Sequence, residues 1–162
     1  MSNSIIRDKL DRGEFFLAPG IHDMMAAVIA NKVGFEIVYG TGYWMTASAY
    51  GLPDAGIATY SQMLDRVSTL ARTSDAAVIA DADTGYGGLL NVHHTVQGYE
   101  EAGITAIQIE DQEFPKKCGH TPGKKCVPLE IMTDKIKVAC DARKDKKNTL
   151  IVARTDIYQA EG

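Results

Sequence analysis

Two acidic residues one position apart, Asp81 and Asp83, follow residues 76–80, an apolar run that is typical of a buried strand. In an extended chain, residues i and i+2 point to the same face, so both carboxylates aim at one point if the strand geometry continues that far. Two such carboxylates repel each other unless a cation or a shared proton lies between them. Because Mg²⁺ prefers oxygen ligands, the pair predicts half of a magnesium site, with Mn²⁺ as a second possible ion.

Residues 81–88 also allow other interpretations. A structural turn capped by the aspartates stays open as the alternative to a metal site. The triplet Asp83-Thr84-Gly85 also occurs in aspartic proteases, but those are all-β proteins, whereas the segments around this triplet alternate between strand and helix. A phosphate-binding loop is disfavoured, because Leu90 occupies the third glycine position and no Gly-Lys-Ser/Thr follows.

The second chemical signal is a thiol, Cys118, with Lys116, Lys117 and His120 beside it. Positive neighbours favour the thiolate, so we expect the pKa of Cys118 to lie below its ordinary value of about 8.5. A thiol that titrates near neutrality donates a proton and regains it within one cycle, which makes Cys118 a candidate general acid. Three alternatives stay open: zinc binding with His120 and Cys126, a covalent nucleophile with His120 as base, and an inert loop cysteine.

Two further charged residues follow predicted strands. Glu110 comes after residues 106–109 and approaches an ion held by Asp81 and Asp83 if the two strands are neighbours; a solvated loop acid is the alternative. Arg154 ends the strand predicted at residues 149–153. A guanidinium holds a carboxylate through two parallel hydrogen bonds, so Arg154 is a candidate substrate ligand, with an internal salt bridge as the alternative.

Polar groups also follow the strand predicted at residues 36–39. Backbone N–H groups, a hydroxyl and a phenol suit a substrate carboxylate, and they are offered by Thr41, Gly42 and Tyr43. A tight turn is the alternative for this stretch. Asp54, which follows a proline, is either a turn residue or an acid that supports the site from outside its first layer, and we count it among the candidate substrate-binding residues.

Composition excludes several classes of protein. The 162 residues are 45% hydrophobic and 23% charged, which is an ordinary globular composition, and the net charge of −4 disfavours a nucleic-acid partner. No apolar run reaches the roughly 18 residues needed to cross a bilayer, so no membrane partner is expected. Three cysteines without a framework spacing, and no signal-peptide core, predict a cytoplasmic protein.

The remaining pattern alternates strands and helices. We expect strands at residues 15–18, 36–39, 76–80, 106–109 and 149–153. Helices are expected at residues 23–33, 59–73, 91–102 and 129–144, with caps at Asp23, Thr59 and Asn91. Long irregular connections are expected between the strand at residues 36–39 and residue 57, and at residues 112–128.

Apolar strands that alternate with helices indicate a parallel sheet in an α/β fold. Two architectures are compatible with five such strands: an open doubly wound sheet, or the first five strands of a (β/α)8 TIM-type barrel, which typically needs about 250 residues. The chain length favours the first. Every segment that carries candidate site residues follows a strand directly. This favours the TIM-type barrel, which we take as the prediction.

Four motifs in order carry a resemblance to a known family. The sequence resembles the isocitrate lyase and phosphoenolpyruvate mutase superfamily, above all its methylisocitrate-lyase-like members, over nearly the whole chain. The motifs are Asp81-x-Asp83-Thr-Gly-Tyr-Gly, Ile109-Glu110-Asp111-Gln112, Lys116-Lys117-Cys118-Gly119-His120 and Ala153-Arg154-Thr155-Asp156. The resemblance implies that residues 1–162 form a single α/β domain, the N-terminal portion of such a barrel.

The resemblance also implies a reaction: Mg²⁺-dependent cleavage of a carbon–carbon bond in a 2-hydroxy di- or tricarboxylate, giving a 2-oxo acid and a carboxylate. Carried over by position, Asp81 and Asp83 hold Mg²⁺ directly or through waters, with Glu110 supporting. Cys118 matches the proton donor and Lys116 the basic residue before it. Substrate contacts match Thr41, Gly42, Tyr43, His120 and Arg154, although family members often have serine at the position of Thr41.

The same family leaves alternatives. An oxaloacetate decarboxylase or a phosphonomutase-type relative is the alternative within the fold, and the cysteine loop favours the lyase over both. Family members continue through three more strands, so we expect the chain to be part of a longer protein, and full-length relatives imply a homo-oligomer. A truncated, non-catalytic assembly module is the alternative from another class.

Overall fold

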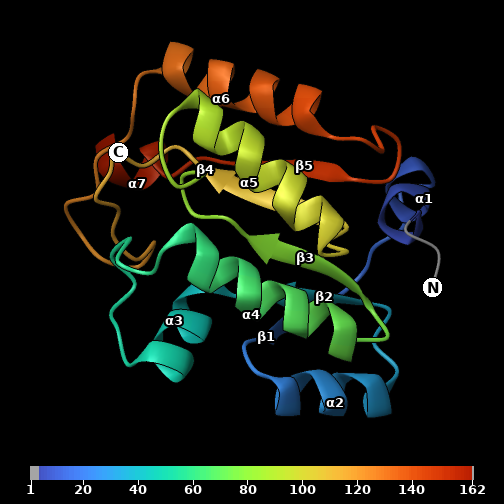
Figure 1. Cartoon of the computed structure of the whole chain (residues 1–162). Helices are drawn as coiled ribbons and strands as arrows, with labels where there is room; N and C mark the ends of the chain where they lie inside the picture. The colour runs from blue at the N-terminus through green and yellow to red at the C-terminus, as the bar shows by residue number, and fades with distance from the viewer. Residues whose placement is uncertain (1–3, 162) are drawn as a thin grey trace.

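Five parallel strands form one sheet in the computed structural model, which describes residues 4–161 (Figure 1). They are β1 (Gly20–Ile21), β2 (Ile37–Gly40), β3 (Ala77–Asp81), β4 (Ala106–Glu110) and β5 (Leu150–Arg154). They lie side by side in chain order, and every neighbouring pair is parallel. A doubly wound sheet reverses its strand order at a switch point, whereas a barrel keeps chain order. The order therefore confirms the barrel-type prediction.

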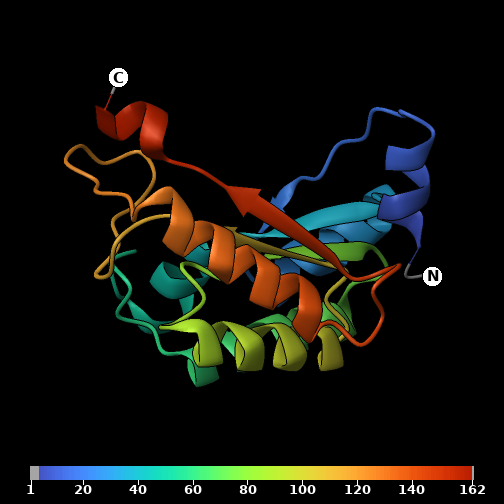
Figure 2. The ribbon, with the colours of Figure 1, turned by 90° about the horizontal axis from the view of Figure 1, so that it is seen from above.

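The helices support the same conclusion. They are α1 (Ile5–Asp11), α2 (Met24–Val33), α3 (Gly42–Tyr50), α4 (Tyr60–Thr73), α5 (Leu89–Glu101), α6 (Leu129–Ala142) and α7 (Ile157–Glu161). Figure 2 shows α4, α5 and α6 on one side of the sheet, and α1 on the other side. Helices that follow successive strands and cover one face are the outer layer of a barrel. None of the helices in residues 4–161 has the length and apolarity to cross a membrane.

Apolar side chains are buried on both faces of the sheet. The larger cluster fills the space between the sheet and its helices, with Val67 and Leu70 of α4 among the fully buried residues. The smaller cluster lies on the inner face. There, Ile6 of α1 packs against the first residue of each of four strands, namely Ile37, Ala77, Ala106 and Leu150. This layer covers the amino end of the sheet, which leaves the carboxyl end for the polar residues.

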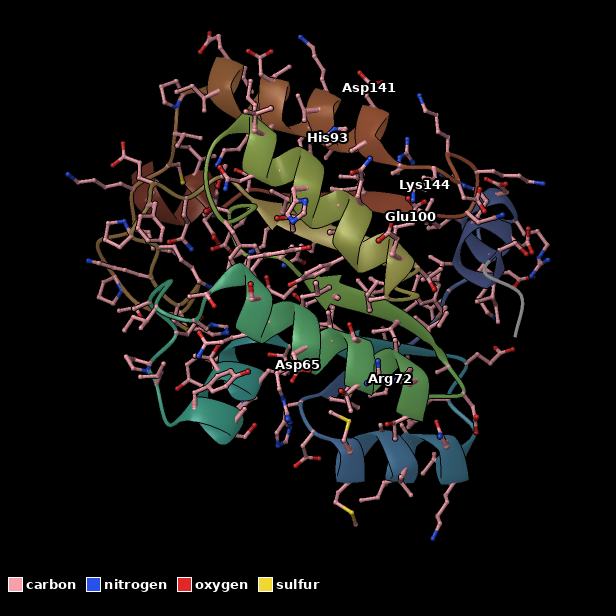
Figure 3. All side chains as sticks on the ribbon, viewed as in Figure 1. Asp65, Arg72, His93, Glu100, Asp141 and Lys144 are labelled. Carbon is pink, nitrogen blue, oxygen red and sulfur yellow. The ribbon has the colours of Figure 1, made fainter. Side chains whose placement is uncertain are left out.

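Side-chain caps set several helix ends where the sequence predicts them. The carboxylate of Asp23 accepts a hydrogen bond from the Ala26 amide at 2.7 Å, and Gly34 ends α2 in the left-handed region with φ of 87°. Thr59 and Gln62 form a reciprocal capping box at the start of α4. Glu100 of α5 accepts hydrogen bonds from the amides of Lys144 and Asp145, so it fixes the turn between α6 and β5 (Figure 3).

The structure corrects the prediction for the N-terminal strand. Residues 15–18 form no strand, and pairing begins when the carbonyl of Pro19 accepts a hydrogen bond from Tyr39 at 2.9 Å, followed by β1. Phe16 and Ala18 pack on the inner cluster, while Phe15 is largely exposed. The apolar character of residues 15–18 therefore reflects packing on the inner face of the sheet and not a strand.

Two helix predictions are also corrected. Residues 42–50, expected to be irregular, form α3, which no side chain caps and which is held by tertiary contacts: Tyr50 Oη donates to the Gln62 carbonyl at 3.0 Å, and Met45 is buried. In α5 the N-cap is Gly88 and not Asn91, because the Asn91 side chain reaches back to accept from the Gly88 amide at 3.2 Å. The four other strands begin and end within one residue of their predicted bounds.

Candidate active site

A cavity of about 550 Å³ opens at the carboxyl ends of β2, β3 and β5. It brings together eight of the eleven residues singled out from the sequence: Thr41, Tyr43, Asp54, Asp81, Lys116, Cys118, His120 and Arg154. Of the other three, Gly42 lies against Asp81, while Asp83 and Glu110 are buried beside Lys116. Tyr39 and Thr121 also line the cavity, and nothing in their sequence surroundings singled them out.

The turn after β3 differs from the predicted extended strand. Asp81 is the last residue of β3, and Asp83 has a φ of 49°, so the two side chains are not related by strand alternation. Asp81 Oδ1 accepts a hydrogen bond from the Asp83 amide at 2.9 Å, and the Gly85 amide donates to the Ala82 carbonyl at 2.9 Å. The aspartates do cap a turn, as the structural alternative predicts, and the same turn keeps Asp81 at the cavity.

Lys116 is the centre of the acidic cluster. Its ammonium lies 2.6 Å from Asp54 Oδ1, 2.6 Å from Asp83 Oδ1 and 3.7 Å from Glu110 Oε1, and the side chain is almost fully buried. Burial alone lowers the pKa of a lysine, but these carboxylates, Asp83 first, together with Asp81 raise the pKa of Lys116 above its ordinary value. The side chain is therefore a permanent cation and not a base.

The carboxylates of this cluster are crowded. Burial first, and then the charge of Asp81, raise the pKa of Asp83 from 3.8 to about 6. Burial also raises the pKa of Glu110 from 4.5 to about 7, although Lys116 and Arg154 act in the opposite direction. The raised pKa values show that the carboxylates of Asp83 and Glu110 bind a proton more readily than free carboxylates do, because they are buried and negative charge is concentrated there. A divalent cation would relieve the same repulsion between carboxylates.

The donor set fits a hard cation through these oxygens, with one restriction. Within residues 4–161, no three His, Cys, Asp or Glu side chains are placed to hold one ion together. Asp81 and Lys116 line the cavity, whereas Asp83 and Glu110 are not among its lining residues and lie beside the Lys116 ammonium. Ligation in part through waters, which Mg²⁺ tolerates, is the mode that these positions allow.

Arg154 is held by internal ion pairs and still lines the cavity. Its Nη1 lies 3.4 Å from Glu110 Oε2 and its Nη2 lies 3.1 Å from Asp156 Oδ1. One third of the side chain remains exposed, at 33%. The internal salt bridge and a surface for an anionic ligand therefore coexist, because the bound carboxylates fix the orientation of the guanidinium.

The cysteine loop packs against Arg154. A Cβ at Gly119 would collide with Arg154 Nη2, so only glycine allows this approach. The lysines beside Cys118 point elsewhere, since Lys116 enters the acidic cluster and Lys117 Nζ donates to the Gly123 carbonyl at 2.9 Å. The polar partners of both lysines therefore lie away from the thiol, although Lys116 lines the same cavity as Cys118.

The zinc alternative finds no support in the described part of the chain. Cys118, Cys126 and Cys140 are all free thiols, and no metal-binding group of three side chains is found among residues 4–161. Burial, together with a hydrogen bond to Asp111, raises the pKa of Cys126 to about 11. Cys126 is therefore a neutral thiol, whereas Cys118 lines the cavity.

Sequence reasoning missed Gln112 and Asp156 as members of the site. Gln112 is 1% exposed and Asp156 is 6% exposed, and Gln112 Nε2 donates to Asp156 Oδ2 at 3.0 Å. Asp156 also pairs with Arg154, so both residues belong to the network behind the cavity. Their only sequence signal is their place within motifs that follow β4 and β5.

Comparisons with known proteins agree with this geometry. The profile of the phosphoenolpyruvate phosphomutase family matches residues 6–162. The chain is 44% identical over 157 residues to 2,3-dimethylmalate lyase of Eubacterium barkeri, a match that covers 97% of this chain and 54% of that protein. It is 48% identical over 144 residues to 2-methylisocitrate lyase of Halalkalibacterium halodurans, covering 89% and 47%. The chain thus spans about half the length of these relatives.

Solved structures match as well. Oxaloacetate acetylhydrolase in complex with the inhibitor 3,3-difluorooxalacetate superimposes with a TM-score of 0.92 at 34% identity, over 99% of this chain and 56% of that one. Phosphonopyruvate hydrolase in complex with oxalate and Mg²⁺ gives a TM-score of 0.85 at 37% identity, over 95% and 52%. Sequence, strand order and cavity agree, and the chain belongs to the phosphoenolpyruvate phosphomutase family, within the PEP mutase/isocitrate lyase superfamily.

Proposed function

We propose that this chain is the catalytic portion of a magnesium-dependent carbon–carbon lyase, which cleaves a 2-hydroxy di- or tricarboxylate such as 2-methylisocitrate into a 2-oxo acid and a carboxylate. One observation carries the proposal: a single cavity holds the thiol of Cys118, the guanidinium of Arg154 and the carboxylate of Asp81. The relatives that cleave 2,3-dimethylmalate and 2-methylisocitrate support it.

The cavity has two places for the carboxylates of such a substrate. Arg154 offers a fixed guanidinium. The first turn of α3 offers the amides of Gly42 and Tyr43, whose N–H groups have no partner within the helix, and the hydroxyl of Thr41 lies beside them. His120, which also lines the cavity, is a further donor for an anionic group.

The reaction needs a proton donor for the product carbanion. When the hydroxyl of the 2-hydroxy acid loses its proton to solvent, from which the Cys118 thiolate later regains one, the hydroxyl oxygen forms the carbonyl of the 2-oxo acid. The bond between the two central carbons breaks, and its electron pair passes to the carbon next to a carboxylate. Cys118 then transfers its thiol proton to that carbon, and the carboxylate product is released. Lys116 supplies a fixed positive charge to the acidic cluster, since it remains an ammonium.

Asp81, Asp83 and Glu110 would hold Mg²⁺, directly or through waters. When bound, the ion supplies a Lewis acid that stabilises negative charge developing on the 2-oxygen. Asp81 lines the cavity and is the candidate for the most direct contact, whereas Asp83 and Glu110, which pair with Lys116, contribute charge outside the cavity lining. The solved complex of phosphonopyruvate hydrolase with oxalate and Mg²⁺ supports this choice of ion.

The test is a substrate panel. The protein is incubated with Mg²⁺ and either 2-methylisocitrate, isocitrate, 2,3-dimethylmalate or oxaloacetate, and the released 2-oxo acid is followed with a coupled dehydrogenase. Release from one of the 2-hydroxy acids that EDTA abolishes supports the lyase and names its substrate. No release from any of the three 2-hydroxy acids would contradict the proposal, and oxaloacetate that also stays unconsumed would favour a non-catalytic assembly module.

A hydrolase or decarboxylase that acts on a 2-oxo dicarboxylate is the second candidate. It is favoured by the likeness to oxaloacetate acetylhydrolase and to phosphonopyruvate hydrolase. It predicts turnover of oxaloacetate alone, with Cys118 dispensable, whereas the lyase requires Cys118. In either case the proposed partner is a small carboxylate, and the working form is proposed to be a homo-oligomer.

A further inference from the structure

We propose that Gln112 is a positioning residue, which holds the segment from Lys116 to Cys118 in its working geometry. This inference rests on the proposed function, because it assigns a role to a residue that acts through the proton donor. Gln112 lies just after β4, outside the cavity lining, and its side chain is buried.

The side-chain amide of Gln112 pairs with the backbone N–H and C=O of one residue, Lys117. Its Oε1 accepts a hydrogen bond from the Lys117 amide at 3.0 Å, and its Nε2 donates to the Lys117 carbonyl at 2.9 Å. A side-chain amide that meets both polar groups of one residue fixes the position and the orientation of that backbone. The residues on either side of Lys117 are Lys116 and Cys118, which enter the acidic cluster and the cavity.

The surrounding loop shows why this pairing matters. Residues 113–125 form an excursion that is closed at its base, where Gln112 bridges Cys126 and the Glu113 amide donates to the Lys125 carbonyl at 2.8 Å. The backbone of Gln112 belongs to the base, while its side chain reaches forward to Lys117. Gln112 therefore connects the fixed end of β4 to the part of the loop that carries Cys118.

The Nε2 of the same amide also lies within hydrogen-bond distance of two carboxylates behind the cavity, so its two N–H groups are shared among three acceptors. Gln112 Nε2 lies 3.1 Å from Glu110 Oε1 and 3.0 Å from Asp156 Oδ2, and Asp156 also binds Arg154. A neutral donor suits this place, because a carboxylate here would face two acids, whereas an apolar group would remove one hydrogen-bond donor from each of them. The loop, the acidic cluster and the end of β5 thus share one side chain.

The test replaces Gln112 with methionine, which has a similar volume and cannot form these hydrogen bonds. Gln97→Met on the outer face of α5 is the matched control. We expect Gln112→Met to lower kcat by about 10- to 100-fold, as a small misplacement of reacting groups does, with a much smaller change in KM. The control keeps both constants.

A second readout needs no turnover. Trypsin cuts after Lys117, Lys124, Lys125 and Lys137, so the three cysteines fall in different peptides and their alkylation by iodoacetamide is measured separately by mass spectrometry. Loss of one ordinary hydrogen bond shifts a local opening equilibrium about fivefold. We therefore expect alkylation of Cys118 to quicken by at least about fivefold in Gln112→Met, with Cys140 unchanged.

An unchanged alkylation rate of Cys118 in Gln112→Met would overturn the inference. If that variant does not fold, hydrogen exchange in the wild type decides: the Lys117 amide is expected to be protected, and exchange at the rate of an open loop would overturn the inference as well. If the wild type cleaves none of the acids, the proposed lyase fails by itself, while alkylation and exchange still decide the role of Gln112.

Discussion

The thiol of Cys118 reaches the cavity because its loop closes over the ends of β4 and β5, and not because its neighbours in the sequence surround it. Lys116 and Lys117 both turn away, toward the acidic cluster and toward Gly123. The thiol shares the wall of the cavity with His120, Arg154 and Lys116. The role of Cys118 as an acid therefore depends on where a substrate is held.

Replacing this thiol tests the proton transfer directly. We expect Cys118→Ser to lower kcat by about 100-fold or more, because a serine hydroxyl is a much weaker acid, while Mg²⁺ and the 2-oxo acid product still stabilise the protein in thermal unfolding. Cys140→Ser in α6 is the control and is expected to keep full turnover. Undiminished turnover of Cys118→Ser would favour the hydrolase or decarboxylase.

Glu110 links the charge of the site to stability. Its pKa is raised from 4.5 to about 7, chiefly by burial, so the folded protein binds the proton more tightly than the unfolded chain does. Protonation of Glu110 therefore adds to the free energy of unfolding. This contribution is fully present below pH 4.5, and it is lost as the pH rises through 7.

We expect Glu110→Gln to remove this dependence. Between pH 4.5 and 7 in EDTA, the free energy of unfolding of the wild type should fall relative to that of the variant, by at most about 3 kcal/mol. Urea denaturation at several pH values measures the free energy of unfolding of both proteins. Glu113→Gln, at an exposed position of the loop, is the control. Parallel stability curves for wild type and Glu110→Gln would show that Glu110 titrates normally in the fold.

Helix α3 decides how the acids of β3 meet the substrate. Its first residue, Gly42, lies so close to Asp81 that a Cβ would be 2.8 Å from Asp81 Oδ2. The absence of a side chain therefore lets the N-terminus of the helix and the carboxylate share one edge of the cavity. Asp81 is packed against the place where the amides of α3 are free.

A methyl group at this contact is a sharp test. We expect Gly42→Ala to displace Asp81, to lower turnover by about 10- to 100-fold and to weaken the stabilisation by Mg²⁺, with the helical content unchanged. Gly88→Ala is the control, since a Cβ there has no atom within 4 Å and φ is −80°. Circular dichroism and thermal unfolding with and without Mg²⁺ measure both. Equal Mg²⁺ responses of the two variants would contradict the contact.

Within residues 4–161 the sheet has two open edges. β1 and β5 each pair with one neighbour in this part of the chain, and its strands keep chain order without closing a barrel. Apolar residues are exposed beside both edges, including Met25 and Ile29 on α2 and Val152 on β5. Open edges with apolar flanks favour association with other chains.

We therefore expect the 162-residue chain to self-associate in a concentration-dependent way. Val152→Lys places a charge on the open edge strand and should raise the dissociation constant at least about tenfold. His93→Lys, on the outer face of α5 away from both edges, is the control (Figure 3). Sedimentation velocity at several concentrations compares them. Equal association of the two variants would exclude the β5 edge as the contact.

The sequence by itself determined the elements and the chemical inventory. Strand β3 was predictable because apolar, non-alternating residues precede the acids, and α2 because Asp23 and Gly34 cap its ends. These signals are local: a cap, a glycine or an apolar run acts within a few residues. The motifs after the strands likewise indicated the family. Their positions indicated which end of the sheet carries the site.

Only the tertiary structure decided which groups meet. No local sequence signal predicts that Lys116 pairs with Asp54 and Asp83. The same holds for the hydrogen bond from Gln112 to Asp156 and for the helix at residues 42–50. Loops from different strands are brought together by the packing of the whole sheet, and a buried charge then takes the partner that it finds there. Sequence spacing fixes which side chains are available, while burial and long-range contact set their partners and their protonation.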